Sequence, residues 1–141
     1  HLMRVQVVRI EAWFLQGRAL LACASEAKAS RKKDYLKRLA LACRMIRKQD
    51  MPSAGGMADI LAAGAAAIGG DQERAVEGFF RASLTLGAAD MSFCKVVCDQ
   101  AQGRLIGGDE GRALVESSDE WMRGQGIANP NSMVRTILPR V

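Results

Sequence analysis

The sequence predicts an all-α protein in which pairs of helices repeat along the chain. Apolar residues recur at three- and four-residue steps through most of the 141 residues, which indicates amphipathic helices. Ala, Leu, Arg and Glu are frequent and favour helix, whereas no segment alternates convincingly as a strand. A helix-ending turn, Gly69-Gly70-Asp71, returns as Gly107-Gly108-Asp109. These three observations favour a stack of about three helix pairs, an alpha-solenoid, followed by a short C-terminal helix.

The first expected pair spans about residues 4–50. Apolar residues spaced by three and four predict a helix from about Leu2 to Ser25 and a second from about Arg31 to Gln49. Ser30 is a candidate N-cap for the second helix. Pro52 ends this pair, because the residue before a proline resists helical geometry.

The second expected pair spans about residues 53–87, with helices at about 53–68 and 72–86. Its first helix carries an alanine-rich run that is apolar nearly all round, which predicts burial. Gly69 and Gly70 supply the left-handed stop of this helix, and Asp71 caps the next one. The second helix is expected to pack through the following side chains: Ala75, Val76, Phe79, Phe80, Ala82, Ser83 and Leu84.

The third expected pair spans about residues 91–126 and repeats this turn. Its helices are expected at about 91–106 and 110–125, with Gly107 and Gly108 as the stop and Asp109 as the cap. A closing helix is expected at about 130–138. Asn129 caps it and Pro130 is its first residue.

Small residues recur at matching places in the pairs. Gly17, Gly64 and Gly103 lie within first helices, where glycine is costly unless neighbouring helices approach closely. Ala75 and Ala113 lie early in second helices, where each is expected to pack behind its turn. With these positions, the sequence resembles a tetratricopeptide repeat, although the repeat is looser than the family's usual length. The resemblance implies an all-α, right-handed superhelix of stacked helix pairs that serves as a scaffold and binds other proteins.

The last third of the chain has a narrower resemblance. This part of the chain is similar to the C-terminal end of large bacterial signalling proteins. The residues that carry the similarity are 103–114, Trp121-Met122, 126–130, and Met133-Val134-Arg135 followed by Leu138-Pro139. Those proteins carry a serine/threonine kinase or ATPase module before a tetratricopeptide-like region. The resemblance implies a regulatory or docking segment, whose enzymatic part lies elsewhere in the parent protein.

Charge is unevenly distributed along the chain, whose net charge is +5. Residues 28–48 hold nine basic residues and one acidic residue, a balance of +8, whereas residues 69–120 hold ten acidic and five basic residues, a balance of −5. The basic face of the second helix is therefore the candidate partner-binding surface. Its candidate residues are Arg31, Lys32, Lys33, Lys37, Arg38, Arg44 and Lys48.

No catalytic, metal or cofactor site is predicted. His1 is the only histidine, which leaves no Ser-His-Asp or Cys-His set. The Gly-Gly-Asp turns lack the phosphate-loop pattern. The four cysteines, Cys23, Cys43, Cys94 and Cys98, are expected to be small, buried and reduced. No apolar run is long enough to cross a membrane, so we expect a cytoplasmic protein.

These observations predict a non-catalytic interaction module. We expect residues 1–3 to be a vector remnant and residues 4–141 to form a single domain cut from a larger bacterial protein. Its partner would be a protein or peptide, or another domain of the parent chain, in the groove of the first helices of the pairs. The alternatives are a nucleic-acid-binding module that uses residues 31–48 and a homo-oligomerisation segment, for example a homodimer.

Overall fold

A computed structural model describes residues 2–139 and contains seven α-helices and no strand within that range, which confirms the all-α class. His1, part of the expected vector remnant, and residues 140–141 of the expected domain lie outside the described residues. The helices are α1 (Leu2–Glu26), α2 (Ala29–Arg47), α3 (Ala54–Ile68), α4 (Gln72–Ala88), α5 (Ser92–Ile106), α6 (Gly108–Gly124) and α7 (Pro130–Ile137).

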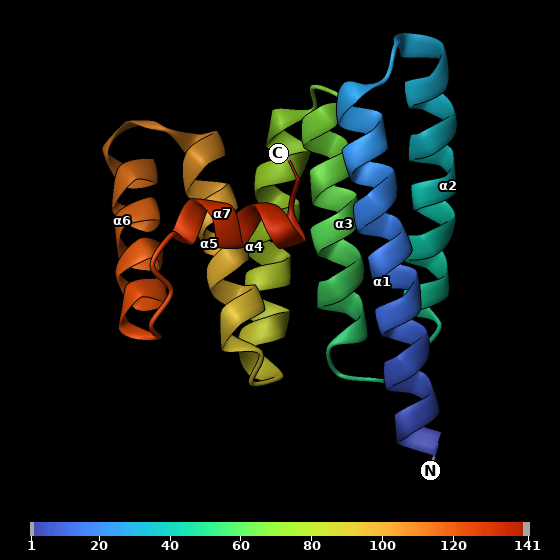
Figure 1. Cartoon of the computed structure of the whole chain (residues 1–141), viewed down its shortest axis with the longest axis horizontal. Helices are drawn as coiled ribbons and strands as arrows, with labels where there is room; N and C mark the ends of the chain where they lie inside the picture. Colours follow the sequence, from blue (N-terminus) through green and yellow to red (C-terminus); the bar gives the residue numbers. More distant parts are fainter. Residues whose placement is uncertain (1, 140–141) are drawn as a thin grey trace.

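The first six helices stand side by side in a row. Figure 1 shows the order α6, α5, α4, α3, α1, α2 across the molecule. Helices that follow one another in the chain run in opposite directions, whereas the neighbours α1 and α3 run in the same direction. Each helix packs against the next one in the chain, and α1 also packs against α3. The chain therefore forms three helix hairpins, α1–α2, α3–α4 and α5–α6.

One apolar core runs through the row and includes α7. Leu21, Leu61, Phe79 and Met122 are fully buried within it. Burying an aliphatic or aromatic side chain of this size contributes about 1.5–3 kcal/mol relative to exposure. Because the core is continuous, the hairpins support one another.

The turn between α3 and α4 has the predicted geometry. Gly70 adopts a φ of 84°, and its N–H donates to the Ala67 carbonyl at 3.1 Å. The Asp71 N–H donates to the Ala66 carbonyl at 2.9 Å, and the Asp71 carboxylate accepts from the Arg74 N–H at 3.1 Å. A left-handed glycine thus ends α3 and an aspartate caps α4.

The second Gly-Gly-Asp turn differs from the first, and the prediction of Asp109 as a cap is wrong. Gly107 and Gly108 both have positive φ, and α6 begins at Gly108. Asp109 therefore already lies inside the first helical turn, where its side chain accepts from Arg112. Ala113, expected to pack like Ala75, is exposed.

Two further expectations are wrong. α2 begins at Ala29 after Lys28, with no side-chain cap, so Ser30 is not the N-cap. Phe80 and Leu84 of α4 are exposed, because the side of α4 that packs into the core passes through Phe79, Ala82 and Leu86. Four residues of the expected stripe, Ala75, Phe79, Ala82 and Ser83, are buried.

The glycines within the first helices allow close packing, as predicted, although not all at equivalent contacts. A Cβ on Gly17 of α1 would collide with the Leu61 side chain of α3, and one on Gly64 of α3 would lie 3.1 Å from Leu21 Cδ1 of α1. Gly103 of α5 packs instead against α6 of its own pair. Glycine thus sets the α1–α3 and α5–α6 approaches.

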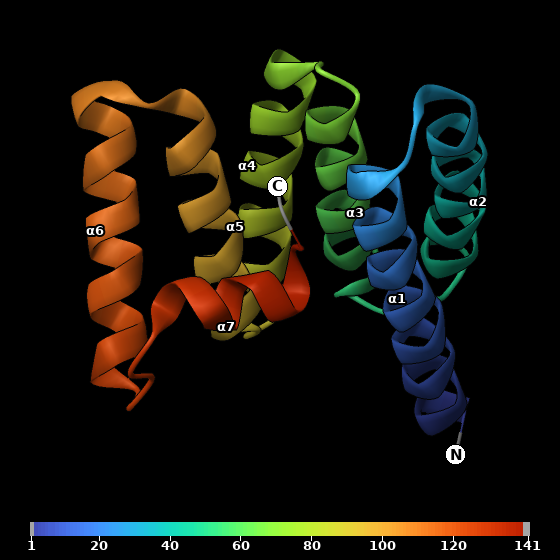
Figure 2. The same cartoon turned by 45° about the horizontal axis from the view of Figure 1, so that its top comes forward.

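Helix α7 leaves the row and crosses it, as Figure 2 shows. Its cap is the predicted one, because the Asn129 side chain accepts from the Ser132 N–H at 3.1 Å. Asn131 bonds Arg104 of α5, and Arg18 Nη1 of α1 donates to the Thr136 carbonyl at 2.8 Å. The chain's last helix thus connects the last helix pair to the first.

Candidate functional site

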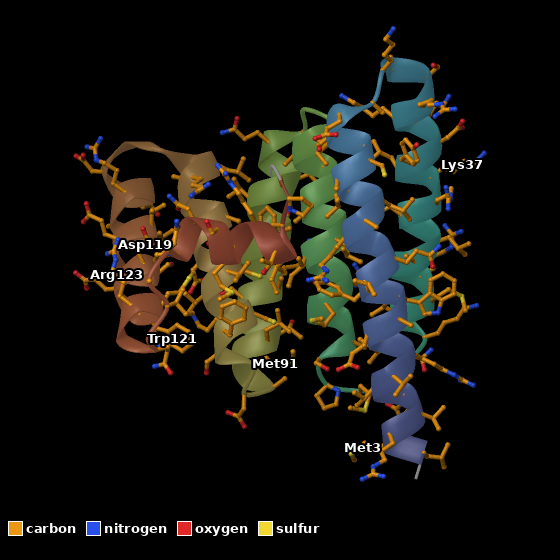
Figure 3. All side chains as sticks on the ribbon, viewed as in Figure 1. Met3, Lys37, Met91, Asp119, Trp121 and Arg123 are labelled. Atoms are coloured by element: carbon orange, nitrogen blue, oxygen red, sulfur yellow. The ribbon has the colours of Figure 1, made fainter. Side chains whose placement is uncertain are left out.

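The basic face predicted on α2 lies at one end of the row. Most of the seven candidate residues are exposed, and Lys32 is half-buried. Figure 3 shows Lys37 on the outer side of α2, whereas Asp119 and Arg123 lie on α6 at the opposite end of the row. Within residues 2–139, none of the seven forms an ion pair with the acidic second half of the chain.

The structure distributes these residues over separate places. Arg31, Lys37 and Arg38 line a shallow hollow near the start of α2, together with Asp34 and Tyr35. Lys48 lies in a second hollow, beside the first turns of α1. Arg44 alone of the seven lines a third hollow, between α2 and α3. The predicted basic face is therefore not a single site.

The third hollow, which we call the α2–α3 groove, has a volume of about 420 Å³. It follows one side of α2 for three turns and continues along α3 to the first turn of α4. The groove is lined by Leu36, Leu39, Ala40, Cys43, Arg44, Arg47, Ala62, Ala65, Ala66, Gly69, Asp71 and Arg74.

The floor of the groove is apolar and results from the alanine-rich run. Ala62, Ala65 and Ala66 are only half-buried, in contrast to the burial predicted for the whole run. On the other side of α3, Ile60, Leu61 and Ala63 are buried in the core. Because a methyl group reaches less far than a leucine side chain, the alanine side of α3 leaves space beside α2.

The rim of the groove is basic. Arg47 Nη2 donates to Asp59 Oδ1 of α3 at 2.6 Å, and the Asp59 side chain is only 11% exposed. No acidic partner is recorded for the guanidinium groups of Arg44 and Arg74 within the described residues. Asp71, the cap of α4, is the one acidic residue of the lining. The rim thus has two unpaired positive charges near one carboxylate.

These charges lie at both ends of the groove. Arg47 contacts Asp59, near the start of α3, whereas Arg74 follows the end of α3 by six residues. Arg44 lies one turn from Arg47 on α2. An elongated anionic group, or two separate acidic groups, would therefore meet a guanidinium at each end.

The thiol of Cys43 belongs to the groove wall. Its Sγ donates to the Ala58 carbonyl at 3.6 Å. Burial raises the pKa of Cys43 to about 11, and the positive charge of Arg47 opposes this shift only in part. At neutral pH the group is therefore a protonated thiol, which is a poor nucleophile. The wall can pack against a ligand but is not arranged for thiolate chemistry.

The other cysteines follow the prediction in part. Cys98 is buried and Cys94 is half-buried, and burial raises the pKa of each thiol. Cys23 is exposed, in contrast to the expected burial. Among residues 2–139, no three His, Cys, Asp or Glu side chains are grouped to hold a metal ion. Over the same range, no helix is long and apolar enough to cross a membrane.

The predicted partner face, formed by α1, α3 and α5, carries α7 instead of open space. Arg18 of α1 and Arg104 of α5 bond α7, and the buried Leu138 lies beside Gly64 of α3. The α2–α3 groove is on another side of α3 and remains open. A partner that binds the chain with α7 in place would therefore find an apolar, basic-rimmed site at α2.

Sequence reasoning missed two members of this groove. Arg47 lies within the basic segment but three residues from Arg44, a spacing that places both on one helix side. Arg74 lies three residues after Asp71, outside the basic segment of residues 28–48. Both arginines flank the alanine-rich helix α3 in the sequence, Arg47 before it and Arg74 after it, and this position could have identified them.

Comparisons with protein-family models, with curated proteins and with solved structures give no match to this chain. Its function is therefore inferred from its own residues and their geometry.

Proposed function

We propose that this chain is a non-catalytic docking module that binds an acidic, partly apolar segment of a partner protein. The observation that carries this proposal is the α2–α3 groove, where an apolar floor lies between guanidinium groups. Grooves of this kind hold the apolar side of a partner segment, while charged groups at the rim select its sequence and orientation.

The fine architecture and setting belong to the same proposal. The three helix hairpins are compatible with a tetratricopeptide-like right-handed superhelix, in which each pair buries its face on the next. The resemblance of residues 103–138 supports a place in a larger bacterial signalling protein in the cytoplasm. Within such a protein, the partner would be another protein or another domain of the same chain.

A protein partner explains the groove better than nucleic acid does. Phosphate backbones are attracted by lysine and arginine alone and need no apolar floor. Several basic residues at α2 line three separate hollows, and one of these hollows, the α2–α3 groove, has an apolar floor with Leu36, Leu39 and alanines. We therefore expect binding to depend on apolar side chains as well as on charge.

The experiment compares two labelled probes of equal net charge by fluorescence anisotropy. One is an amphipathic peptide of leucine and glutamate, and the other is a single-stranded oligonucleotide. We expect saturable peptide binding that persists from about 50 to about 200 mM salt, a range over which phosphate-driven binding falls steeply. Preferential, salt-sensitive binding of the oligonucleotide would overturn the proposal and favour the nucleic-acid alternative.

A further inference from the structure

We infer that the α2–α3 groove receives one edge of an amphipathic helix that carries acidic side chains at both ends of a short apolar stripe. This inference rests on the proposed docking function and names the site and the partner's chemistry. The lining provides the three supporting features: the length of the groove, its alanine floor and the position of its arginines.

The length of the groove fits about three turns of helix. Its lining on α2 extends from Leu36 to Arg47, which corresponds to about 16 Å at 1.5 Å per residue. A volume of about 420 Å³ has room for a few side chains but not for a helix about 10–12 Å wide. The partner helix therefore lies over the groove and inserts only its apolar edge.

The floor favours large apolar side chains from the partner, because the α3 side of the groove carries only alanines. Ala62, Ala65 and Ala66 of α3 lie opposite Leu36 and Leu39 of α2. Inserted leucine-sized side chains would fill the space that the alanine methyl groups leave open. Together, the burial of these side chains would provide most of the binding free energy.

The arginines favour acidic side chains at the two ends of the partner helix's apolar stripe. Arg44 and Arg74 lie toward opposite ends of the groove and have no acidic partner within residues 2–139. Arg47 is already bonded to Asp59. A guanidinium can bind a carboxylate through two parallel hydrogen bonds, so one glutamate at each end of the apolar stripe matches the two unpaired groups.

The test uses a fluorescein-labelled peptide of about 16 residues, with leucines along one edge and a glutamate at each end of that stripe. A scrambled peptide of identical composition serves as its control. The charge variant is Arg44→Glu with Arg74→Glu, two exposed positions, the second in the first turn of α4, where an acidic residue is favourable. The steric variant is Ala65→Phe, which fills the floor without changing charge.

The matched control variant is Lys33→Glu with Arg38→Glu. These two residues are exposed on α2 outside the groove, and the change in net charge is the same as in the charge variant. We expect the charge variant and the steric variant each to weaken peptide binding by about tenfold or more, and the control to weaken it by less than about threefold. Circular dichroism checks that each variant is folded, and Ala65→Met replaces Ala65→Phe if the latter unfolds.

Two results would overturn the inference. The first is an equal loss of affinity in Lys33→Glu/Arg38→Glu and Arg44→Glu/Arg74→Glu, which would indicate general charge attraction. The second is unchanged affinity in a folded Ala65 variant. In both cases the peptide still binds, so the docking function survives and only the site is wrong. Failure of the wild-type chain to bind either peptide would instead overturn the proposed function.

Discussion

The backbones of Gly103 in α5 and Gly111 in α6 lie in direct contact. A Cβ on Gly103 would lie 2.6 Å from the Gly111 carbonyl oxygen, and a Cβ on Gly111 would collide with the Gly103 carbonyl. No side chain separates the two helices at this point. Because the obstacle is backbone on both sides, neither helix can accommodate a methyl group by a rotamer change.

Gly103→Ala is therefore expected to destabilise the chain by about 1–3 kcal/mol or more, the usual cost of overpacking. Urea unfolding followed by circular dichroism would measure this change. Gly55→Ala is the control, because a Cβ at Gly55 meets nothing within 4 Å in α3. It should stabilise by up to about 1 kcal/mol, since alanine favours helix over glycine. Equal stability of Gly103→Ala and wild type would show that α5 and α6 do not cross as described.

Asp90→Gly is expected to stabilise the chain. Asp90 is the only non-glycine residue with positive φ, 57°, within residues 2–139. Its N–H and that of Met91 close the end of α4 on the Gly87 and Leu86 carbonyls. A left-handed conformation costs about 1–2 kcal/mol for most residues and less for aspartate. We therefore expect a gain of about 0.5–1 kcal/mol in unfolding experiments, whereas Gly70→Ala, at φ 84°, should lose a similar amount.

Thiol labelling should separate the four cysteines. Cys23 is exposed and should react first with a thiol reagent at pH 8, whereas Cys43 and Cys98 are buried and should react only after opening of the structure. Mass spectrometry of digested, labelled protein would assign each site. Equal rates at Cys23 and Cys43 would contradict the burial described here.

The raised pKa of Cys43 also predicts a dependence of stability on pH. The folded state binds the thiol proton more tightly, with a pKa of about 11 against an ordinary value of 9.0. Its contribution to stability is therefore complete below pH 9 and is lost as pH rises from 9 to about 11. Comparison of urea unfolding in wild type and Cys43→Ala should show a smaller loss over this range in the variant.

Arg47→Ala is expected to destabilise by about 1–3 kcal/mol, because it leaves the largely buried Asp59 carboxylate without its charged donor. The Arg47 side chain is itself 44% exposed, so solvent compensation favours the lower part of this range. Asp59→Ala in the same background should recover part of the loss. A double variant as unstable as the sum of the two single ones would contradict coupling between these residues.

Helix positions and one turn could be predicted well from sequence. The expected helices agree with α1 to α7 within about two residues at each end, because periodicity and glycine stops act locally. The turn at Gly70 and Asp71 follows the same local rule. The similar turn at Gly107 and Asp109 led to the wrong prediction that Asp109 caps α6, because the contact of α5 with α6 sets the start of α6 there.

The candidate site could be predicted only in part. The basic character of α2 is evident in the sequence, but its division among three hollows depends on how α1 and α3 pack beside it. The alanine run was expected to be buried on all sides. One side of the run is half-buried because of the way α3 packs against α2. This packing is a tertiary property that composition cannot predict.

The crossing of α7 has a consequence for how the molecule unfolds. In an open array of helix pairs, each pair touches only its neighbours, so terminal pairs can fray independently. Here Thr136 and Leu138 bind the first hairpins, while Asn131 binds the last. Displacement of α7 would therefore break contacts with both ends of the row. Amide protons in α1 and α6 should therefore exchange through one shared opening event, despite their distance along the row.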